Sequence, residues 1–240
     1  LSCPQAGIPP AAVTGGQSRR TFREWIVQVV LLLIGLCIAH LGVTLFLQTE
    51  LGSDPFNVFV QGLFRALPWP AWAAMTHGRV HLLVSLLILL VVLMADRSYV
   101  GVGTVLCMAL GGPIIDVYTL WLAPVIHGGL PLLWRLGLLV AGCLILAFGM
   151  TIVIRSQAGT GPNDLVAVVL SDKLKKPFGP VRVAVDCAFA GIGLALGGVL
   201  GIGTVVCAFL VGPAAQLFFP VSEQICQIAL RQFAGESSRV

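Results

Sequence analysis

The sequence predicts an all-α, polytopic integral membrane protein built from two tandem homologous repeats of about 100 residues each. Its 240 residues are 58% hydrophobic and only 10% charged, and the mean hydropathy is +0.99. Several apolar runs exceed the roughly 18 residues that indicate a membrane-spanning helix. A long block of the chain also recurs about 100 residues later. These observations exclude an ordinary soluble domain and a disordered chain.

The internal repeat rests on three pairs of similar blocks in the same order. The block GVGTVLCMALGGP begins at Gly101 and recurs as GIGTVVCAFLVGP from Gly201. Upstream, GRVH recurs as GPVR, and LGSDPFN recurs as AGTGPND. The predicted organisation is therefore a mobile cytoplasmic tail over 1–24, membrane repeat 1 over 25–125, membrane repeat 2 over 126–222, and a C-terminal interfacial helix and tail over 223–240.

Each repeat is predicted to contain three long transmembrane helices and one short helix. The six long helices are expected at 25–48, 79–95, 101–124, 132–154, 180–199 and 201–220. The two short segments, 55–66 and 162–172, each begin at the Pro of a Gly-x-x-Pro break. At 1.5 Å per residue each reaches about 17 Å, well short of the roughly 30 Å hydrocarbon core. They are therefore predicted to be broken or re-entrant helices.

The path of these short segments leaves two topologies open. If they do not cross the membrane, each half crosses three times and the halves are inverted; if they cross, each half crosses four times and the halves are parallel. The rule that basic residues concentrate on the cytoplasmic side is satisfied by both topologies. The inverted topology puts Arg65, Arg79 and Arg135 outside, and the parallel one puts only Arg97 and Arg155 outside. Both topologies place the two termini in the cytoplasm.

Charge and cysteine content narrow the classes of partner. The net charge is +4, but the basic residues flank apolar segments instead of forming a nucleic-acid patch, so the expected partner is the lipid bilayer. The seven cysteines show no metal-ligand spacing and are expected to pack as small apolar side chains. No catalytic or cofactor motif is present. We therefore predict a protein that is not an enzyme, with no metal, no cofactor and no nucleic-acid partner, and with a possible homodimer.

The two breaks supply most of the candidate substrate-binding residues. Proline after a Gly-rich turn starts a helix whose N–H groups attract anions, and transporters built from repeats use such ends near the midplane. Carboxylates there could instead simply cap the helix, which is their commoner role. The candidates are Gly52, Asp54, Pro55 and Asn57 at the first break, and Gly159, Pro162, Asn163 and Asp164 at the second.

The remaining candidate substrate-binding residues are polar or charged residues inside apolar helices. Arg182 and Asp186 are four residues apart, so they share a helix face and can pair. Their repeat equivalents are His81 and Ser85, so the predicted site is asymmetric. The alternative is that Arg182 reaches the interface and Asp186 only neutralises it.

A last pair of polar positions lies in the final helix of each repeat. Asp116 and its equivalent Gln216 are expected either to face the bundle interior or to lie at the interface.

The repeated glycine and proline motifs resemble those of a known family of membrane proteins. Gly159-Thr-Gly-Pro162, Gly179-Pro-Val-Arg182, Gly201-Ile-Gly-Thr204 and Gly212-Pro213 are similar to the pattern of the YczE/YyaS/YitT family of bacterial integral membrane proteins. The chain departs from that pattern at Asn163-Asp164, where many members carry Arg-Asp, and at Asp186, where Glu is common. The resemblance covers about residues 25–222. It implies a multi-pass protein of the bacterial plasma membrane from a largely uncharacterised family.

Two functions follow as hypotheses. The first is a secondary transporter of a small anionic or zwitterionic substrate, bound between the two repeats at the Gly/Pro-broken helices. The alternative is a non-transporting accessory protein that supports a partner enzyme or pathway in the membrane. We favour the first, because paired helix breaks and intramembrane charges are typical of transporter sites.

Overall fold

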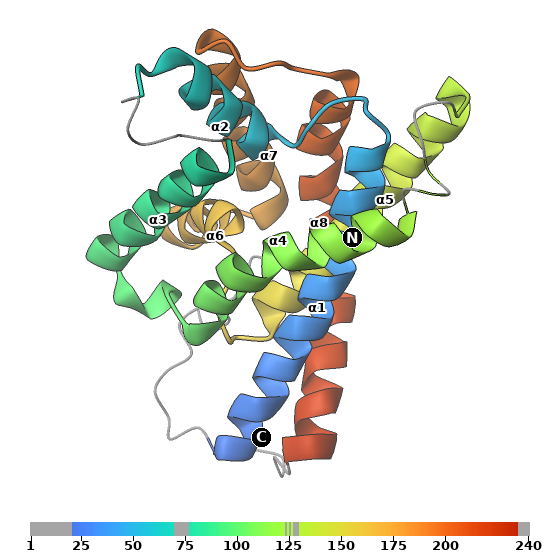
Figure 1. Cartoon of the computed structure of the whole chain (residues 1–240). Helices are drawn as coiled ribbons and strands as arrows, with labels where there is room; N and C mark the ends of the chain where they lie inside the picture. The colour runs from blue at the N-terminus through green and yellow to red at the C-terminus, as the bar shows by residue number, and fades with distance from the viewer. Residues whose placement is uncertain (1–20, 70–76, 123, 125, 127–129, 235–240) are drawn as a thin grey trace, which may run out of the picture.

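A computed structural model describes residues 21–69, 77–122, 124, 126 and 130–234 of the chain. Within these residues the regular secondary structure is entirely helical (Figure 1). The helices are α1 (Phe22–Gln48), α2 (Pro55–Ala66), α3 (His77–Ala95), the 3-10 turn η3 (Arg97–Tyr99), α4 (Val102–Leu122), α5 (Leu132–Arg155), α6 (Pro162–Leu174), α7 (Phe178–Ala195) and α8 (Ile202–Ala234). The all-α class predicted from the sequence is confirmed. The predicted tail over 1–24 lies mostly outside the described residues. Its last three residues belong to α1, which begins at Phe22.

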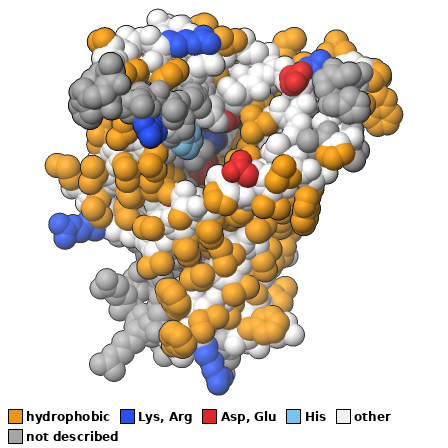
Figure 2. Space-filling view, in the orientation of Figure 1, with side chains coloured by type: hydrophobic (Ala, Val, Ile, Leu, Met, Phe, Trp, Pro, Cys, Tyr) orange, Lys and Arg blue, Asp and Glu red, His pale blue; other side chains and the backbone are white. Residues whose placement is uncertain are grey.

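Five of the described helices, α1, α4, α5, α7 and α8, are long and apolar enough to cross a membrane. Within α3 the apolar stretch Arg79–Ala95 is shorter. Large apolar side chains are exposed along these helices, and hydrophobic atoms cover much of the surface in Figure 2. Exposed Leu, Ile and Val side chains in such numbers are stable only against lipid. The chain is a multi-pass membrane protein.

Helices α1 and α5 pack against each other in opposite directions. A Cβ atom built on Gly35 would lie 3.0 Å from the Gly149 carbonyl oxygen, and one on Gly42 would lie 2.5 Å from the Gly142 carbonyl oxygen. Residue numbers thus rise along one helix as they fall along the other, and the ribbons show the same crossing (Figure 1). Backbones approach this closely only where both helices present small residues. Inverted halves predict this antiparallel pairing, whereas parallel halves would run α1 and α5 in the same direction.

We expect the Gly149→Ala substitution to destabilise the protein by roughly 1–3 kcal/mol, the usual cost of overpacking a tight core. The added methyl group would lie 2.2 Å from the Ala39 backbone nitrogen, so the two helices would have to separate. Gly137→Ala on the same helix is the matched control, because a Cβ there meets nothing within 4 Å. Thermal unfolding in detergent would measure both. Equal midpoints for the two variants would contradict this view of the α1–α5 contact.

The C-terminal segment differs from the prediction. The sequence predicted a separate interfacial helix and tail over 223–240, but α8 continues without a break from Ile202 to Ala234 through Pro213 and Pro220. Proline is tolerated inside membrane helices because neighbouring groups satisfy the freed carbonyls. Residues 235–240 lie outside the described part of the chain.

Polar contacts with α5 explain why the second part of α8 stays on the bundle. The Thr151 and Ser222 hydroxyl oxygens are 2.6 Å apart in the buried interface. One turn away, Arg155 and Glu223 form an ion pair of 3.3 Å, and the Arg155 guanidinium stands 5.1 Å from the centre of the Phe219 ring. Ser222, Glu223 and Phe219 thus bind α8 to α5, so the helix continues along the bundle. A hydrophobic pattern alone did not reveal them.

The turn between α3 and α4 is fixed to α6 by a long-range hydrogen bond. The Tyr99 hydroxyl in η3 donates to the Asp172 carboxylate. Burial, together with this bond, raises the pKa of Tyr99 above its ordinary value. The first half therefore contacts the second half at this joint as well as through α1 and α5.

Candidate functional site

The two Gly/Pro breaks have the same backbone conformation. Glu50 has a φ of 52° and Gly52 a φ of 144°, while Gln157 has a φ of 58° and Gly159 a φ of 144°. A φ of 144° is accessible in practice only to glycine, and the non-glycine residues two positions earlier adopt the left-handed region. The sequence similarity of the breaks therefore extends to their geometry.

Each break docks onto the first turn of the last helix of the other half. The Gly203 N–H at the start of α8 donates to the Leu51 carbonyl over 2.9 Å, and the Gly103 N–H at the start of α4 donates to the Ala158 carbonyl over 2.8 Å. These bonds satisfy helix N–H groups that would otherwise lack a partner inside the membrane. The two halves are thus interleaved through their breaks.

The glycines at the breaks allow this docking. A Cβ on Gly52 would lie 2.9 Å from the Thr204 hydroxyl, and one on Gly159 would lie 2.4 Å from the Thr104 backbone nitrogen. Gly52 and Gly159, predicted as substrate-binding residues, therefore act in the structure as close-packing residues that position the helix starts behind them.

The two short helices begin differently after their breaks. Asp54 caps α2, because its carboxylate accepts a hydrogen bond of 3.1 Å from the Asn57 backbone N–H; the Asn57 side-chain amide donates to the same carboxylate. The equivalent N-cap of α6 is Gly161, which offers no side-chain acceptor. Pro55 and Pro162 occupy the first helical positions, as predicted. Capping is confirmed for Asp54, whereas α6 begins without a side-chain cap.

Arg182 lies at the centre of a buried charged cluster. Its Nε donates to the Asp186 carboxylate over 2.9 Å within α7, and its guanidinium also donates to the Asp164 carboxylate on α6. Arg182 and Asp186 are 6% and 1% exposed, and the Asp164 side chain is 17% exposed. The predicted pairing of Arg182 with Asp186 is therefore present. Asp164, which the capping hypothesis assigned to the helix start, binds the arginine instead.

Acidic groups outnumber basic ones around this cluster. Asp54 from the first half interacts electrostatically with Asp186, as Asp164 does. Two carboxylates, those of Asp164 and Asp186, thus contact the Arg182 guanidinium, and Asp54 adds a third acidic group near Asp186. The excess acidic charge is the property that distinguishes the observed site from a simple anion site.

The remaining predicted residues lie around the cluster. His81 on α3 stacks edge-on against Phe56, with ring centres 5.2 Å apart, and Phe56 packs edge-on against Phe189 of α7 at 5.4 Å. Asn163 is half-buried, and its side-chain oxygen lies 3.4 Å from where a Cβ on Gly161 would stand.

The molecule is hollowed on the face where these helices meet. Figure 2 shows a depression between α2 and α3 on one side and α4 on the other, with acidic, basic and histidine side chains inside it and largely apolar atoms around it. In the same orientation, α6 and α7 lie in this region behind α3 (Figure 1). The charged cluster of α6 and α7 therefore belongs to the region of the fold that carries this hollow.

Several residues next to the cluster were not among the predicted site residues. His40 on α1, hydrogen-bonded to the Leu36 carbonyl over 2.8 Å, and Cys107 on α4 both interact electrostatically with Asp164. Cys207, the repeat equivalent of Cys107, interacts electrostatically with Asp54 and Asp186. The sequence signal that could have pointed to the two cysteines is that Cys107 and Cys207 occupy equivalent positions in the repeated block. Within the described residues, no group of three His, Cys, Asp or Glu side chains could hold a metal ion.

The last two helices of each half differ in how closely they pack. On α8, a Cβ at Gly212 would lie 2.6 Å from the Gly179 carbonyl oxygen of α7, and the Gly179 N–H donates to the Gln216 side chain over 2.9 Å. On α4, the equivalent Gly112 has nothing within 4 Å of its Cβ position, and Asp116 is exposed. The α7–α8 contact beside Arg182 is closed, and the equivalent face of α4 is open.

Comparison with known proteins gives a family but no activity. A model described as "Family of unknown function (DUF6198)" matches residues 26–220. An uncharacterized protein of Haemophilus influenzae is 27% identical over 83% of this chain and 87% of its own. The uncharacterized membrane protein YczE of Bacillus subtilis is 24% identical over 87% and 93%, and YyaS of the same organism is 25% identical over 80% and 92%. No solved structure matches. The resemblance to the YczE/YyaS/YitT group is confirmed.

Proposed function

Since the chain belongs to DUF6198, a family of unknown function, we propose from its site that it is a secondary transporter of a small zwitterionic solute and catalyses no chemical change. The observation that carries this proposal is the buried Arg182 between Asp164 and Asp186, on the helix α7 against which both short helices pack, in the region of a surface hollow. Charged groups within a membrane bundle are costly, so they are retained where they bind ions or solutes. Broken helices with inward-facing ends serve the same purpose in known transporter folds.

The charge balance favours a zwitterion over a simple anion. Asp54 already caps the start of α2, so that end has lost much of its attraction for a second negative group. The start of α6 has no side-chain cap, and Arg182 lies nearby, so a carboxylate of the solute is attracted there. A cationic group of the solute offsets the excess acidic charge of Asp54, Asp164 and Asp186. An amino-acid-like solute carries both groups.

We further propose that the two halves are inverted repeats with three crossings each, α3 being the sixth crossing helix. The antiparallel packing of α1 and α5 supports this arrangement, because parallel repeats would run these equivalent helices in the same direction. The 12 and 13 residues of α2 and α6 support re-entrant paths. Such a protein has both termini in the cytoplasm and lies in a bacterial plasma membrane.

The unequal packing of equivalent helices supports transport by alternating access. In inverted repeats, one conformation opens a path through one half while the other half is closed, and exchange of the two arrangements moves the path to the other side. Gly212 is packed against α7, whereas Gly112 is open. With both termini inside, Gly112 lies at the middle of α4 and Asp116 one turn further towards its outer end. The described conformation is then open to the outside and closed to the cytoplasm.

The experiment that tests the function is a thermal-unfolding screen of the purified protein against amino acids, simple organic anions and simple amines. A solute that binds only the folded protein raises the unfolding temperature, by an amount set by its concentration relative to Kd. We expect amino-acid-like zwitterions to stabilise the protein and the matched monoanions to have little effect. A stabilising zwitterion should then be taken up by proteoliposomes.

The variants Arg182→Ala and Asp164→Asn should both lose this stabilisation. Asp164→Asn is the safer of the two, because its side chain is partly exposed and its substitution leaves Arg182 paired with Asp186. Glu50→Gln is the control and should respond like the parent protein, because the exposed Glu50 carboxylate pairs with Arg135 and not with Arg182. Unchanged stabilisation and uptake in a folded Asp164→Asn variant would refute the site. The absence of any shift or uptake across the panel would favour an accessory role.

A further inference from the structure

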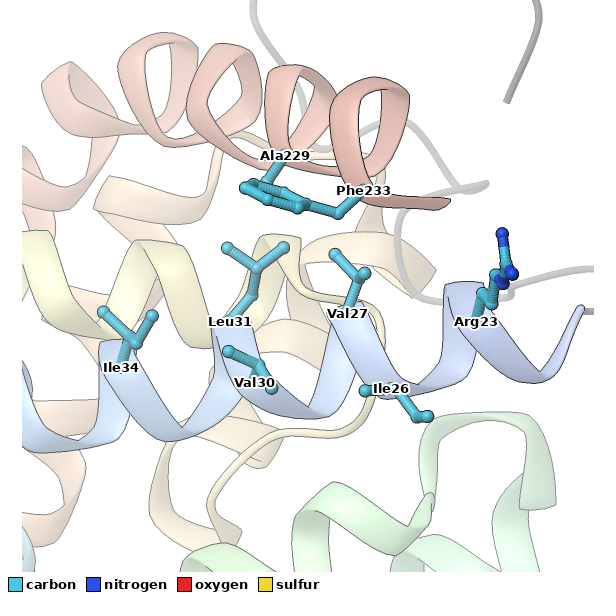
Figure 3. Close-up of a pocket in the computed structure, with 8 residues that line it drawn as sticks. All are labelled: Arg23, Ile26, Val27, Val30, Leu31, Ile34, Ala229 and Phe233. Atoms are coloured by element: carbon cyan, nitrogen blue, oxygen red, sulfur yellow. The ribbon is translucent and has the colours of Figure 1, made fainter. Parts of the chain in front are cut away.

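Helices α1 and α8 separate towards the ends at which the chain begins and finishes, and an apolar groove of about 500 Å³ lies between them. Figure 3 shows Val27 and Leu31 of α1 pointing towards Phe233 and Ala229 of α8, with Arg23 at one end of the groove. Deeper in the bundle the two helices are in contact through the buried side chains of Leu31 and Cys226. The groove is therefore closed at its inner end and open at the end marked by Arg23.

The length of the groove corresponds to one leaflet of a bilayer. From Arg23 to Ile34 the helix rises about 17 Å at 1.5 Å per residue, and half of the hydrocarbon core is about 15 Å. The lining between these residues is apolar, and Ile34 is exposed at the inner end. One straight hydrocarbon chain fits this length, with its polar end at the level of Arg23.

The charge at the open end selects the head group. Arg23 is exposed and forms no ion pair with any residue in the described ranges. The neighbouring Glu24 carboxylate accepts from the Thr21 backbone N–H in the capping box of α1, so it is engaged at the helix start. Exposed Phe22 and Trp25 flank Arg23 at the depth where aromatic side chains meet lipid head groups.

From this arrangement we infer that the groove binds one anionic phospholipid, with an acyl chain between α1 and α8 and the phosphate on Arg23. A guanidinium at this depth binds phosphate oxygens by charge-assisted hydrogen bonds. The lipid would hold the free ends of the two helices together, where their own side chains no longer meet. This inference does not depend on the proposed transport activity.

Native mass spectrometry with added phosphatidylglycerol or phosphatidylcholine of the same acyl chains tests the inference. We expect one tightly retained phosphatidylglycerol per chain and binding of phosphatidylcholine about fivefold weaker, the difference that one basic side chain makes near an anionic head group. Arg23→Gln should remove this preference. Arg231→Gln, an arginine at the same end of α8 that does not line the groove, should retain it.

A second pair of variants tests the acyl-chain site itself. Ala229→Trp fills the groove and should abolish retention of both lipids, whereas Ile228→Trp, on a neighbouring exposed position outside the groove, should not. Equal retention of phosphatidylglycerol in the Arg23→Gln and parent proteins would overturn the inference. So would a lipid-free dimer that dissociates on the Ala229→Trp substitution, because the groove would then hold a second copy of the chain.

Discussion

Replacement of Arg182 by alanine is expected to lower the free energy of unfolding by about 3–5 kcal/mol, the usual cost of leaving a buried charge without its partner. Asp186 is 1% exposed and would lose its 2.9 Å hydrogen bond from Arg182, and Asp164 would lose its partner as well. The Asp186 carboxylate is too deeply buried to be solvated where it lies. This is the largest stability effect that we expect from a single side chain.

The double variant Arg182→Ala/Asp186→Ala should recover much of that loss, because it removes both charges of the buried pair. Glu50→Gln should cost less than about 1 kcal/mol, since its partner Arg135 is 3.9 Å away and Glu50 is largely exposed. Unfolding by a denaturing detergent, followed by circular dichroism, measures all three variants. A double variant no more stable than Arg182→Ala would show that the cluster is not held by this pair.

The second large effect is expected from a matched pair of substitutions in α4 and α8. Gly212→Leu cannot fit the closed α7–α8 contact, because even a Cβ would lie 2.6 Å from the Gly179 carbonyl oxygen. At Gly112 a Cβ meets nothing within 4 Å, so we expect the open face of α4 to accommodate Gly112→Leu. If the halves alternate, Gly212→Leu should favour the opposite conformation, whereas Gly112→Leu should hold the described one. Both variants should lose solute flux.

Reaction of introduced cysteines with a water-soluble maleimide, carried out on the detergent-purified protein so that both sides are reached, distinguishes the two conformations. Asp116→Cys and Gln216→Cys are the reporters, in a chain with Cys3 and Cys187 replaced by serine. Relative to the parent, Gly212→Leu should increase labelling at position 216 and decrease it at 116 by tenfold or more, since roughly 1.4 kcal/mol of overpacking corresponds to a factor of ten. Gly112→Leu should leave the labelling pattern unchanged. The same response in both variants would contradict alternating access while leaving a binding site intact.

Much of the secondary structure followed from the sequence because lipid imposes strong local rules. The proline at each break placed the starts of α2 and α6 correctly at Pro55 and Pro162, and long apolar runs placed α1 and α5 within a few residues. The end of α8 was predicted wrongly. The Thr151–Ser222 and Arg155–Glu223 contacts hold the last turns of α8 against α5. They join residues far apart in the sequence, so a local hydrophobic pattern does not predict them.

The candidate site was only partly predictable. The Arg182–Asp186 pair follows from four-residue spacing on one helix. The Asp164 contact depends on how α6 turns towards α7, and the approach of Asp54 depends on how the two halves interleave. His40 forms a hydrogen bond with the Leu36 carbonyl inside its own helix, but its position near Asp164 depends on how α1 crosses the second half.

The sequence by itself determined the membrane class, the helical segments, the two breaks and the residue types available for a site. Those properties depend on hydropathy, on proline and glycine, and on spacing along one helix, all of which are local. Only the tertiary structure decided the antiparallel pairing of α1 with α5, the contact of Asp164 with Arg182 and the difference between Gly112 and Gly212. These depend on contacts between distant segments, whose free energies are set by packing and burial and not by any short stretch of chain.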